Sequence, residues 1–261
     1  MRKQLSPDEN KGSVGTLARG LDILELFAGD SPELTQTEIS ERLGLPVPTV
    51  HRLVKLLTER GWLVRDSASR RLRLGLGAAR LLPAVRLPDL AREPLRALAE
   101  RSGETVNLAT LDTAPGTGGA EVLYLVSETG ANLLTLRSHV GLRLPAHATA
   151  LGKCLLAELD DEAARRAAGR EPYAELTPKT VTSWEALRRQ LERVRREGVA
   201  YSREEYEIGL HSIAVPLAWM DGDGPAAVNV SLPSSRAGRD ATAELTRELR
   251  AAAARITGAA A

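Results

Sequence analysis

The sequence is poor in cysteine, in aromatic residues and in long apolar runs. Its 261 residues include one cysteine, Cys154, so no disulfide can form within the chain, which fits a reducing cytoplasm. Aromatic residues make up 3%, too few for the base-stacking surfaces of single-strand and RNA binders. No run approaches the roughly 20 apolar residues of a membrane span, and the N-terminus lacks a signal-peptide core. We therefore expect a cytoplasmic protein that has no membrane partner.

Charge is balanced over the whole chain but concentrated in one part of it. The formal net charge is +1, yet residues 51–80 hold eight Lys and Arg against two acids, which gives 8 − 2 = +6. A basic segment of this kind is typical of a surface that contacts phosphates. The length suffices for two domains. We expect a flexible arm (1-15), a winged helix-turn-helix (16-78), a linker with a linker helix (79-102) and a second domain (103-261).

The segment from Thr35 to Leu74 predicts the winged helix-turn-helix. Thr35 and Glu38 have capping-box spacing, and Gly44 is the residue type that ends a helix in the left-handed region. A second helix is expected over about 47–60, with four apolar residues at core spacing and a polar, basic opposite face. An earlier helix is expected to cover both helices with Leu17, Leu21, Leu24 and Phe27. Such hairpins also occur as packing or protein-binding modules.

A basic wing is predicted directly after the second helix. Residues 61–64 have the pattern of a strand, and Asp66 to Ser69 are turn residues. In the run from Arg70 to Leu74 the side chains alternate, so Leu72 and Leu74 are expected inside, and Arg71 and Arg73 outside. Double-stranded DNA is the partner that this arrangement favours.

The candidate DNA contacts lie on the outer face of the second helix and on the wing. Arg52 is the best candidate for a bidentate contact with guanine in the major groove, and Lys55 is assigned to phosphates together with the wing arginines. The full set is Thr37, Pro48, Thr49, His51, Arg52, Lys55, Arg70, Arg71 and Arg73. A symmetric dimer would require a pseudo-palindromic operator.

The second half of the chain has a mixed pattern. Strands are expected at 105–111, 121–126, 133–137, 212–220 and 226–232, and helices at about 89–102, 148–159, 184–197 and 240–256. A Thr182–Glu185 capping box should open the third of these helices, and a Gly- and Pro-rich loop spans Asp112–Ala120. Hairpins outnumber βαβ units, so we expect an antiparallel sheet with helices packed against it, and an α+β fold overall.

Three features that suggest catalysis or a cofactor have simpler interpretations. Gly152-Lys153 resembles the end of a P-loop, but His147 and Cys154 occupy positions that require Gly and Ser or Thr. Cys154 is typical of a small core residue rather than a nucleophile. The histidines have no metal-ligand spacing. We therefore expect no catalytic residue, no metal and no cofactor.

The order of the motifs resembles the IclR-type bacterial transcriptional regulators over nearly everything from about Val14 to Ile256. The resemblance is carried by Arg19-Gly20-Leu21, the 43–46 turn, the basic wing, HATALGK at 147–153, EIGLHSIAVPL at 207–217 and NVSLPSSR at 229–236. It implies an N-terminal winged helix, a GAF-like effector-binding domain, and dimers or dimers of dimers. A small molecule in the second domain is then expected to alter operator binding, with repression as the default.

The resemblance also implies where the effector binds. By motif position the ligand residues are Ala150, Leu151, Ser202, Ser212, Asn229 and Ser231. A helix N-terminus beside short polar side chains suits a carboxylate-containing metabolite, and the apolar wall is expected from Leu144, Leu151, Ile213 and Val230. Family members often carry Ser where Asn229 stands and Cys where Ser212 stands, so the location transfers better than the ligand.

The sequence thus predicts a sequence-specific regulator whose DNA binding responds to an effector. One alternative is a constitutive DNA-binding protein whose second domain is purely structural. Another is an enzyme, but we find no set of nucleophile, base and orienting group in the second domain. Ligand-induced stabilisation would separate the regulator from the constitutive binder.

Overall fold

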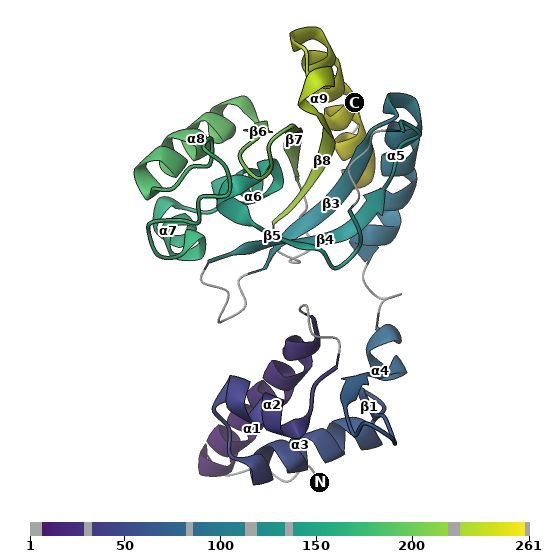
Figure 1. The fold of residues 1–261 in the computed structure, drawn as a ribbon, viewed down its shortest axis with the longest axis vertical. Coiled ribbons are helices and arrows are strands. Elements are labelled where there is room, and N and C mark those ends of the chain that lie inside the picture. The colour runs from purple at the N-terminus through teal and green to yellow at the C-terminus, as the bar shows by residue number, and fades with distance from the viewer. Residues whose placement is uncertain are drawn as a thin grey trace. The chain divides into compact units, whose positions relative to one another are not determined.

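The structure is a computed structural model that describes residues 7–28, 33–81, 86–112, 119–133, 138–218 and 225–258, with residues 7–14 and 79 described for their backbone only. The chain divides into two compact units, Met1–Val85 and Arg86–Ala261 (Figure 1). Each unit has its own hydrophobic core, so each is described by itself. None of the described helices is long and apolar enough to cross a membrane.

The N-terminal unit is a winged helix-turn-helix, as the sequence predicted. Its elements are α1 (Pro7–Glu25), the 3-10 helix η1 (Leu26–Ala28), α2 (Gln36–Leu43), α3 (Val47–Glu59), β1 (Leu63–Arg65), β2 (Leu72–Leu74) and α4 (Leu76–Ala79). The two strands pair antiparallel and form the wing. Its core consists of Ile23, Phe27, Leu34, Ile39, Val50, Leu53, Val54, Leu63 and Leu72.

Residues next to α2 set its ends. Thr35 Oγ1 accepts a hydrogen bond from the Glu38 N–H at 3.2 Å, and Glu38 Oε2 accepts one from the Thr35 N–H at 2.6 Å. The predicted capping box is therefore confirmed. Gly44 ends the helix in the left-handed region, with φ 61°, where a glycine has no steric penalty. These local bonds fix the tight turn that places α3 against α2.

The first helix differs from the prediction in two respects. It begins at Pro7, within the segment that was expected to be a flexible arm. Leu17 and Leu21 are 66% and 50% exposed, whereas Ile23 is buried. Leu24 and Phe27 pack against the core as predicted. Ile23, which lies about 200° around the helix from Leu21 at 3.6 residues per turn, joins them in place of Leu17 and Leu21. In the wing, Leu74 is also exposed rather than inside.

The C-terminal unit is a six-stranded antiparallel sheet covered by helices, which confirms the predicted antiparallel sheet with helices packed against it. Its elements are α5 (Arg86–Ser102), β3 (Thr105–Asp112), β4 (Glu121–Glu128), β5 (Arg143–Pro145), η3 (Ala146–Ala148), α6 (Ala150–Ala157), α7 (Asp161–Ala168), α8 (Trp184–Glu197), β6 (Ala200–Arg203), β7 (Leu210–Leu217), β8 (Ala226–Pro233), η4 (Ser234–Arg236) and α9 (Arg239–Thr257). The strand order is β5-β4-β3-β8-β7-β6.

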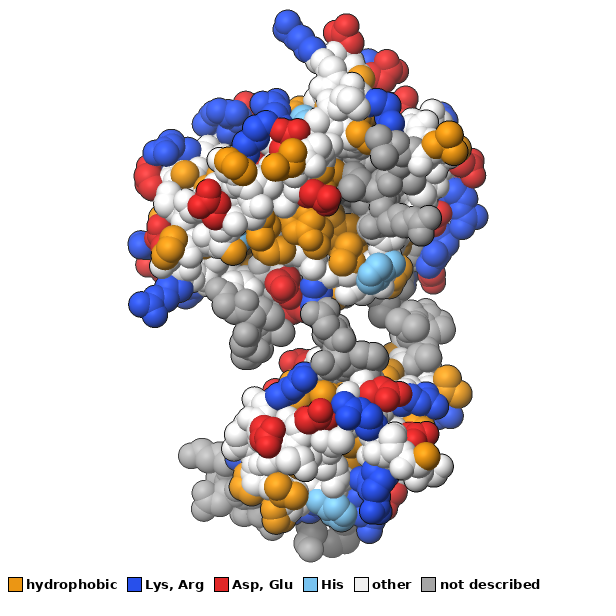
Figure 2. Space-filling model, in the orientation of Figure 1, with side chains coloured by type: hydrophobic (Ala, Val, Ile, Leu, Met, Phe, Trp, Pro, Cys, Tyr) orange, Lys and Arg blue, Asp and Glu red, His pale blue; other side chains and the backbone are white. Residues whose placement is uncertain are grey.

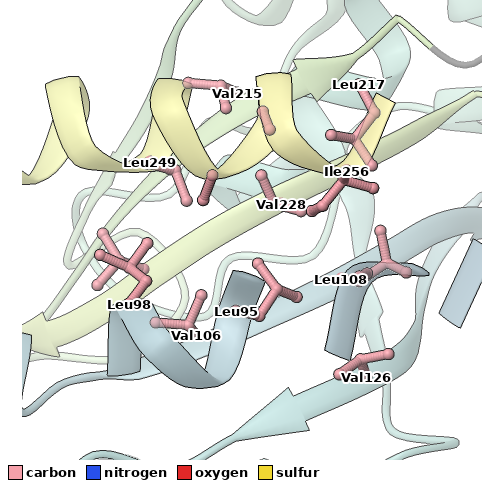
Figure 3. Close-up of a cluster of buried hydrophobic side chains, with 14 of the residues drawn as sticks. Leu95, Leu98, Val106, Leu108, Val126, Val215, Leu217, Val228, Leu249 and Ile256 are labelled. Carbon is pink, nitrogen blue, oxygen red and sulfur yellow. The ribbon is translucent and has the colours of Figure 1, made fainter. Parts of the chain in front are cut away.

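The sheet separates two hydrophobic cores. On one face α5 and α9 pack against the strands, and Figure 3 shows Leu95 of α5, Leu249 of α9 and Val228 of β8 among the buried side chains of this core. On the other face α6 packs against β7 and β8, and α7 and α8 pack against α6, in a core that includes Ala214 and Ala227. Because side chains alternate along a strand, β7 and β8 each supply residues to both cores. Polar residues of the strands that point toward α6 therefore lie between the sheet and the helices.

Several predictions for this unit need correction. The strand expected at Leu133–Arg137 is absent at Leu133, and residues 134–137 lie outside the described residues; β5 instead forms ten residues later. The sequence did not predict α7 and β6. The N-cap of α8 is Ser183, and the Trp184 N–H donates to Glu171 Oε2 at 2.8 Å, so the Thr182–Glu185 capping box does not open that helix.

Two connecting segments also bear on the predictions. The helix expected inside the linker 79-102 is α5, whose buried residues Leu87, Ala91, Leu95 and Leu98 belong to the α5–α9 core. It is therefore an integral layer of the C-terminal unit. Most of the Asp112–Ala120 loop, residues 113–118, lies outside the described residues, as do residues 221–224 between the strands predicted at 212–220 and 226–232.

Candidate functional site

The outward face of α3 carries the predicted major-groove residues. Val50, Leu53 and Val54 are buried against the unit's core, which turns the opposite side of the helix to solvent. Pro48, His51, Arg52 and Lys55 are exposed, Thr49 is half-buried, and Thr37 of α2 is exposed. Lys55 lies 3.9 Å from Glu59, one helical turn away, in an exposed pair that contributes little. The helix thus presents a row of polar side chains to an external partner.

The wing turn is built around Asp66. Its Oδ1 accepts hydrogen bonds from the N–H groups of Ala68 and Ser69 at 3.1 and 2.7 Å. The bond from the Ser69 N–H is the largest influence that lowers the pKa of Asp66 below its usual value. Arg70 follows with a φ of 59°, and both Arg70 and Arg73 are exposed. The wing therefore carries Arg70 in its turn and Arg73 on β2, both exposed to solvent. Figure 2 shows Lys and Arg side chains on the surface of this unit.

Arg71 does not point outward as the alternation predicted. Its Nη2 lies 3.2 Å from Glu38 Oε1 and donates to the Glu33 carbonyl oxygen at 3.2 Å. Residue 71 precedes β2, so the strand alternation does not govern it. The guanidinium instead ties the wing to the N-terminus of α2, where the Thr35 N–H holds the pKa of Glu38 below its usual value. Arg71 therefore differs from the other wing arginines.

A small cavity lies where the N-terminus of α6 meets strands β6, β7 and β8. It is lined by Tyr124, Leu144, Thr149, Ala150, Ser202, Tyr206, Leu210, Ser212, Asn229 and Ser231. Its volume is about 20 Å³, which is room for about one water molecule. The sheet register brings the hydroxyls together, because Ser202 pairs with Ser212 and Ser212 pairs with Ser231. Directly paired residues of an antiparallel sheet point to the same face.

Five of the six predicted ligand residues line this cavity, and Leu151 does not. Leu151 is fully buried in the α6–α8 core, because one step along a helix turns a side chain by about 100° away from Ala150. Ile213 and Val230, expected in the apolar wall, lie in the opposite core. Each is adjacent to a cavity residue on its strand, so it must face the other way. Only Leu144 of the predicted wall remains.

The sequence did not predict four of the lining residues, Tyr124, Thr149, Tyr206 and Leu210. Thr149 carried a usable signal, since a threonine before an apolar helix is a typical N-cap, and its Oγ1 accepts from the Gly152 N–H at 3.0 Å. Tyr124 comes from β4 and Tyr206 from the β6–β7 connection. Only the tertiary fold brings these two aromatic rings to the cavity.

The polar groups of the cavity are already bonded to one another. Asn229 Nδ2 donates to Ser212 Oγ at 2.8 Å and to Ser231 Oγ at 2.9 Å. The two serine hydroxyls are 3.1 Å apart, and Ser202 Oγ donates to the Ala148 carbonyl at 2.9 Å. No Lys, Arg, Asp or Glu is among the described residues that line the cavity. The site therefore offers neutral hydrogen-bonding groups within an apolar surround.

A buried ion pair holds the cavity wall in place. Lys153, one turn into α6, is 1% exposed, and its Nζ lies 2.6 Å from Glu205 Oε1 and 2.9 Å from Gln190 Oε1. Burial is the largest influence on the pKa of Lys153 and lowers it, while Glu205 opposes this shift. Tyr206, the neighbour of Glu205, lines the cavity. The ion pair thus links the β6–β7 connection to α6, the helix whose N-terminus faces the cavity.

A larger hollow of about 280 Å³ lies elsewhere on this unit. It is lined by ten residues that include Pro145, His147, Arg170 and Tyr173. His147 Nε2 donates to the Ala174 carbonyl at 3.0 Å, and burial lowers the pKa of His147. None of the six predicted ligand residues lines this hollow. Its size approaches that of typical ligand pockets, so it provides a matched control for experiments on the smaller cavity.

Three features of the sequence could suggest a nucleophile, a metal site or a phosphate-binding loop, and the structure shows the surroundings of each. Cys154 is buried, and burial raises the pKa of its thiol, which opposes the reactive thiolate form. Within the described residues no group of three or more His, Cys, Asp and Glu side chains could hold a metal ion. Lys153, which the P-loop comparison would place on phosphate, is committed to Glu205.

Comparisons with known proteins agree with this arrangement. The model of the bacterial transcriptional regulator IclR C-terminal domain matches residues 80–258, and that of the IclR helix-turn-helix domain matches residues 16–67. The chain is 34% identical to the HTH-type transcriptional regulator BhcR of Paracoccus denitrificans, over 92% of this chain and 88% of BhcR. It is 29% identical to the transcriptional repressor IclR of Escherichia coli, over 94% and 90% of the two chains.

A solved structure adds a bound ligand. The chain is similar to an IclR homologue from Microbacterium hydrocarbonoxydans, crystallised in complex with 4-hydroxybenzoate, with a TM-score of 0.72 and 30% sequence identity. The match covers 93% of this chain and 98% of that one. Together, these matches and the two units described above show that the chain belongs to the IclR family of bacterial transcriptional regulators, with a helix-turn-helix DNA-binding domain and a C-terminal effector-binding domain.

Proposed function

We propose that α3 lies in the major groove of a specific operator and that the wing contacts the flanking backbone. The observation that carries this assignment is the contrast among arginines. Arg52, Arg70 and Arg73 are exposed and form no ion pair with any residue that the structure describes, whereas Arg71 is paired internally. Arg52 is assigned to a guanine edge, with Pro48, Thr49 and His51 beside it. Lys55, Arg70 and Arg73 are assigned to phosphates.

We also propose that the protein acts in the cytoplasm as a homodimer or a dimer of dimers and represses transcription. Similarity to the repressor of Escherichia coli supports repression. A two-fold symmetric dimer requires a pseudo-palindromic operator whose half-sites lie about one helical turn, ~34 Å, or a multiple apart. Selection of bound duplexes from a random library, followed by sequencing, tests this directly. Enriched sequences without inverted half-sites would contradict the symmetric arrangement.

For the effector we propose a small organic acid whose carboxylate sits in the cavity beside α6. The N-terminus of α6 supplies a positive dipole end, and Ser212, Asn229 and Ser231 supply short polar groups. Tyr124 and Tyr206 provide aromatic surface for the rest of the molecule. The complex of the Microbacterium homologue with 4-hydroxybenzoate supports a carboxylate of this size as a first probe.

The size of the cavity implies how the effector acts. At about 20 Å³ the cavity cannot enclose an organic acid without movement of its walls. The effector therefore binds a conformation in which α6 or the β6–β7 connection has shifted. Only a difference in its affinity for two conformations can change DNA binding. The same small volume is the observation that favours the alternative, a constitutive DNA-binding protein whose second domain is structural.

A thermal-shift screen of the full-length protein tests the effector site. The probes are 4-hydroxybenzoate, other aromatic acids, small aliphatic acids, sugar acids and amino acids. A ligand at about 100 times its Kd stabilises the protein by roughly 2.7 kcal/mol. We expect a hit that is lost in Ser231→Ala and kept in His147→Gln, the control at the larger hollow. The reverse pattern would place the ligand in that hollow, and no hit in any class would favour the constitutive DNA binder.

A further inference from the structure

A continuous row of polar side chains leads from β4 to the cavity. Ser127 Oγ lies 2.8 Å from Ser138 Oγ, and Ser138 Oγ donates to Asn107 Oδ1 at 2.6 Å. Asn107 Nδ2 then donates to Asn229 Oδ1 at 2.9 Å. Asn107 is 1% exposed and pairs directly with Asn229 across β3 and β8, yet it is not among the residues that line the cavity.

The row has a direction, because each side-chain amide has one accepting oxygen and one donating nitrogen. Asn107 accepts from Ser138 and therefore donates toward Asn229. Asn229 accepts with its oxygen, so both hydrogens of its amide nitrogen go to Ser212 Oγ and Ser231 Oγ. From Ser138 onward, each side-chain donor points toward the cavity. Hydrogen bonds aligned in this way polarise one another.

Ser212 and Ser231, at the cavity end of this row, determine which hydrogen-bonding groups the cavity offers a ligand. Ser212 Oγ and Ser231 Oγ each accept from Asn229, so their own hydroxyl hydrogens are left to donate. One hydrogen can bridge the 3.1 Å between the two oxygens, and Ser212 Oγ also lies 3.4 Å from the Val230 carbonyl. When Ser212 Oγ uses its hydrogen for either of these two bonds, the hydroxyl hydrogen of Ser231 remains for the ligand. Ser202 differs, since its hydrogen is given to the Ala148 carbonyl.

We propose that Asn107 and Asn229 are the residues that set the specificity of the effector site, by making it a donor-only site for the oxygen of a carboxylate. The inference rests on the proposed function, which places the effector in this cavity. The serine hydroxyls and the N–H groups at the start of α6 donate to the same oxygen-bearing group. An ammonium or guanidinium group finds no acidic side chain among the described lining residues and meets hydrogens instead of lone pairs.

Asn107 acts as a positioning residue through Asn229. If residue 107 accepted from Asn229 instead of donating to it, the Asn229 amide would turn over and present its oxygen to the two serines. Their hydrogens would then point to Asn229, and the cavity would present lone pairs. The Asn107→Asp variant creates this situation once its carboxylate is ionised, with almost no change in shape. Ser127→Ala is the matched control, because Ser138 continues to donate to Asn107.

The first test follows ligand binding by calorimetry with three probes of one shape: 4-hydroxybenzoate, 4-hydroxybenzamide and 4-hydroxybenzylamine. We expect the full-length wild type to prefer the carboxylate and not to bind the amine. In Asn107→Asp, carboxylate affinity should fall about 10- to 100-fold as the pH rises from 5 to 9. Wild type and Ser127→Ala should agree within about two-fold at each pH. A wild type that prefers the amine would overturn the proposal.

The second test needs no ligand. The chain has four asparagines, Asn10, Asn107, Asn132 and Asn229, so selective ¹⁵N-Asn labelling gives four side-chain amide pairs. We expect nuclear Overhauser contacts from the Asn229 amide protons to the Cβ protons of Ser212 and Ser231. Contacts to residue 107 instead would overturn the proposal. The expected contacts in a wild type that binds no probe would leave the donor direction in place and contradict the proposed effector site.

Discussion

The outward face of α3 and the cavity beside α6 use polar side chains in opposite ways. On α3 and the wing, Arg52 and Arg73 extend into solvent without an internal ion pair among the described residues, so their charges are available to DNA. In the cavity, Asn229 makes three hydrogen bonds, and its neighbours Ser212 and Ser231 are bonded as well. DNA binding therefore adds pairings to free charges, whereas a ligand meets side chains that are already hydrogen-bonded to one another. The first surface depends on charge and salt, and the second on the geometry of donors and acceptors.

The largest expected effect comes from breaking the charge pair next to the cavity. Lys153→Met leaves Glu205 buried beside a methyl group, and removing one partner of a buried pair costs about 3–5 kcal/mol. For a protein of this size, thermal unfolding should shift by about 2–4 °C per kcal/mol. Differential scanning calorimetry checks this, and the transition that shifts should be that of the C-terminal unit.

A double variant shows whether the cost comes from the uncompensated charge. Lys153→Met with Glu205→Leu removes both charges and should recover most of the lost stability, because a well-packed apolar pair can replace a buried ion pair. Its response to the effector should still be impaired, since Tyr206 loses the neighbouring ion pair between Glu205 and Lys153. A double variant as unstable as Lys153→Met alone would show that packing, rather than charge, is what Lys153 contributes.

On the DNA-binding face the largest effect is expected at Arg52. Arg52→Ala should weaken operator binding roughly 5- to 150-fold and leave binding to scrambled duplex almost unchanged, because a bidentate guanine contact is worth about 1–3 kcal/mol of discrimination. Fluorescence anisotropy with both duplexes at one salt concentration measures this. Equal losses on the two duplexes would assign Arg52 to the phosphates.

The comparison also shows which parts of the molecule the sequence could predict. The capping box of Thr35 with Glu38 and the turn at Gly44 depend on residues within a few positions, and both predictions were confirmed. The contact of Arg71 with Glu38 joins residues 33 positions apart and was missed. Local spacing determines how a helix begins and ends. Which side chain a distant arginine meets depends on the packed fold.

The residues of the cavity could likewise be predicted only in part from the sequence. The period of two correctly places Asn229 and Ser231 on one face, and the family resemblance supplies the helix that faces them. The same period predicts that Ile213 and Val230 point away from the cavity, because each is next to a cavity residue on its strand. Both lie in the core on the opposite face of the sheet. Tyr124 and Asn107 reach the site only because β3 and β4 join β8 in the strand order β4-β3-β8. Single-strand patterns carry no such information.

A smaller effect separates two wing arginines that are two residues apart. Arg73→Ala should weaken binding to all duplexes about equally and reduce the slope of log K against log salt by about 1. Arg71→Ala should change that slope less, since its guanidinium is committed to Glu38, and should instead loosen the N-terminal unit. Titrations at several salt concentrations give both slopes. Equal changes in slope would show that Arg71 leaves Glu38 to contact DNA.

The smallest expected effect is a dependence of stability on pH in the C-terminal unit. Burial is the largest cause that lowers the pKa of His147 and of His211 from the ordinary value of 6.5. Between the folded-state pKa and about pH 6.5 the unfolded chain binds more protons than the folded one, so stability is complete above pH 6.5 and falls as the pH drops through the folded-state values. Thermal unfolding from pH 8 to 5 should show this decline. His147→Gln, which can still donate to Ala174, should flatten it, and an unchanged pH profile would show that His147 does not contribute to the decline.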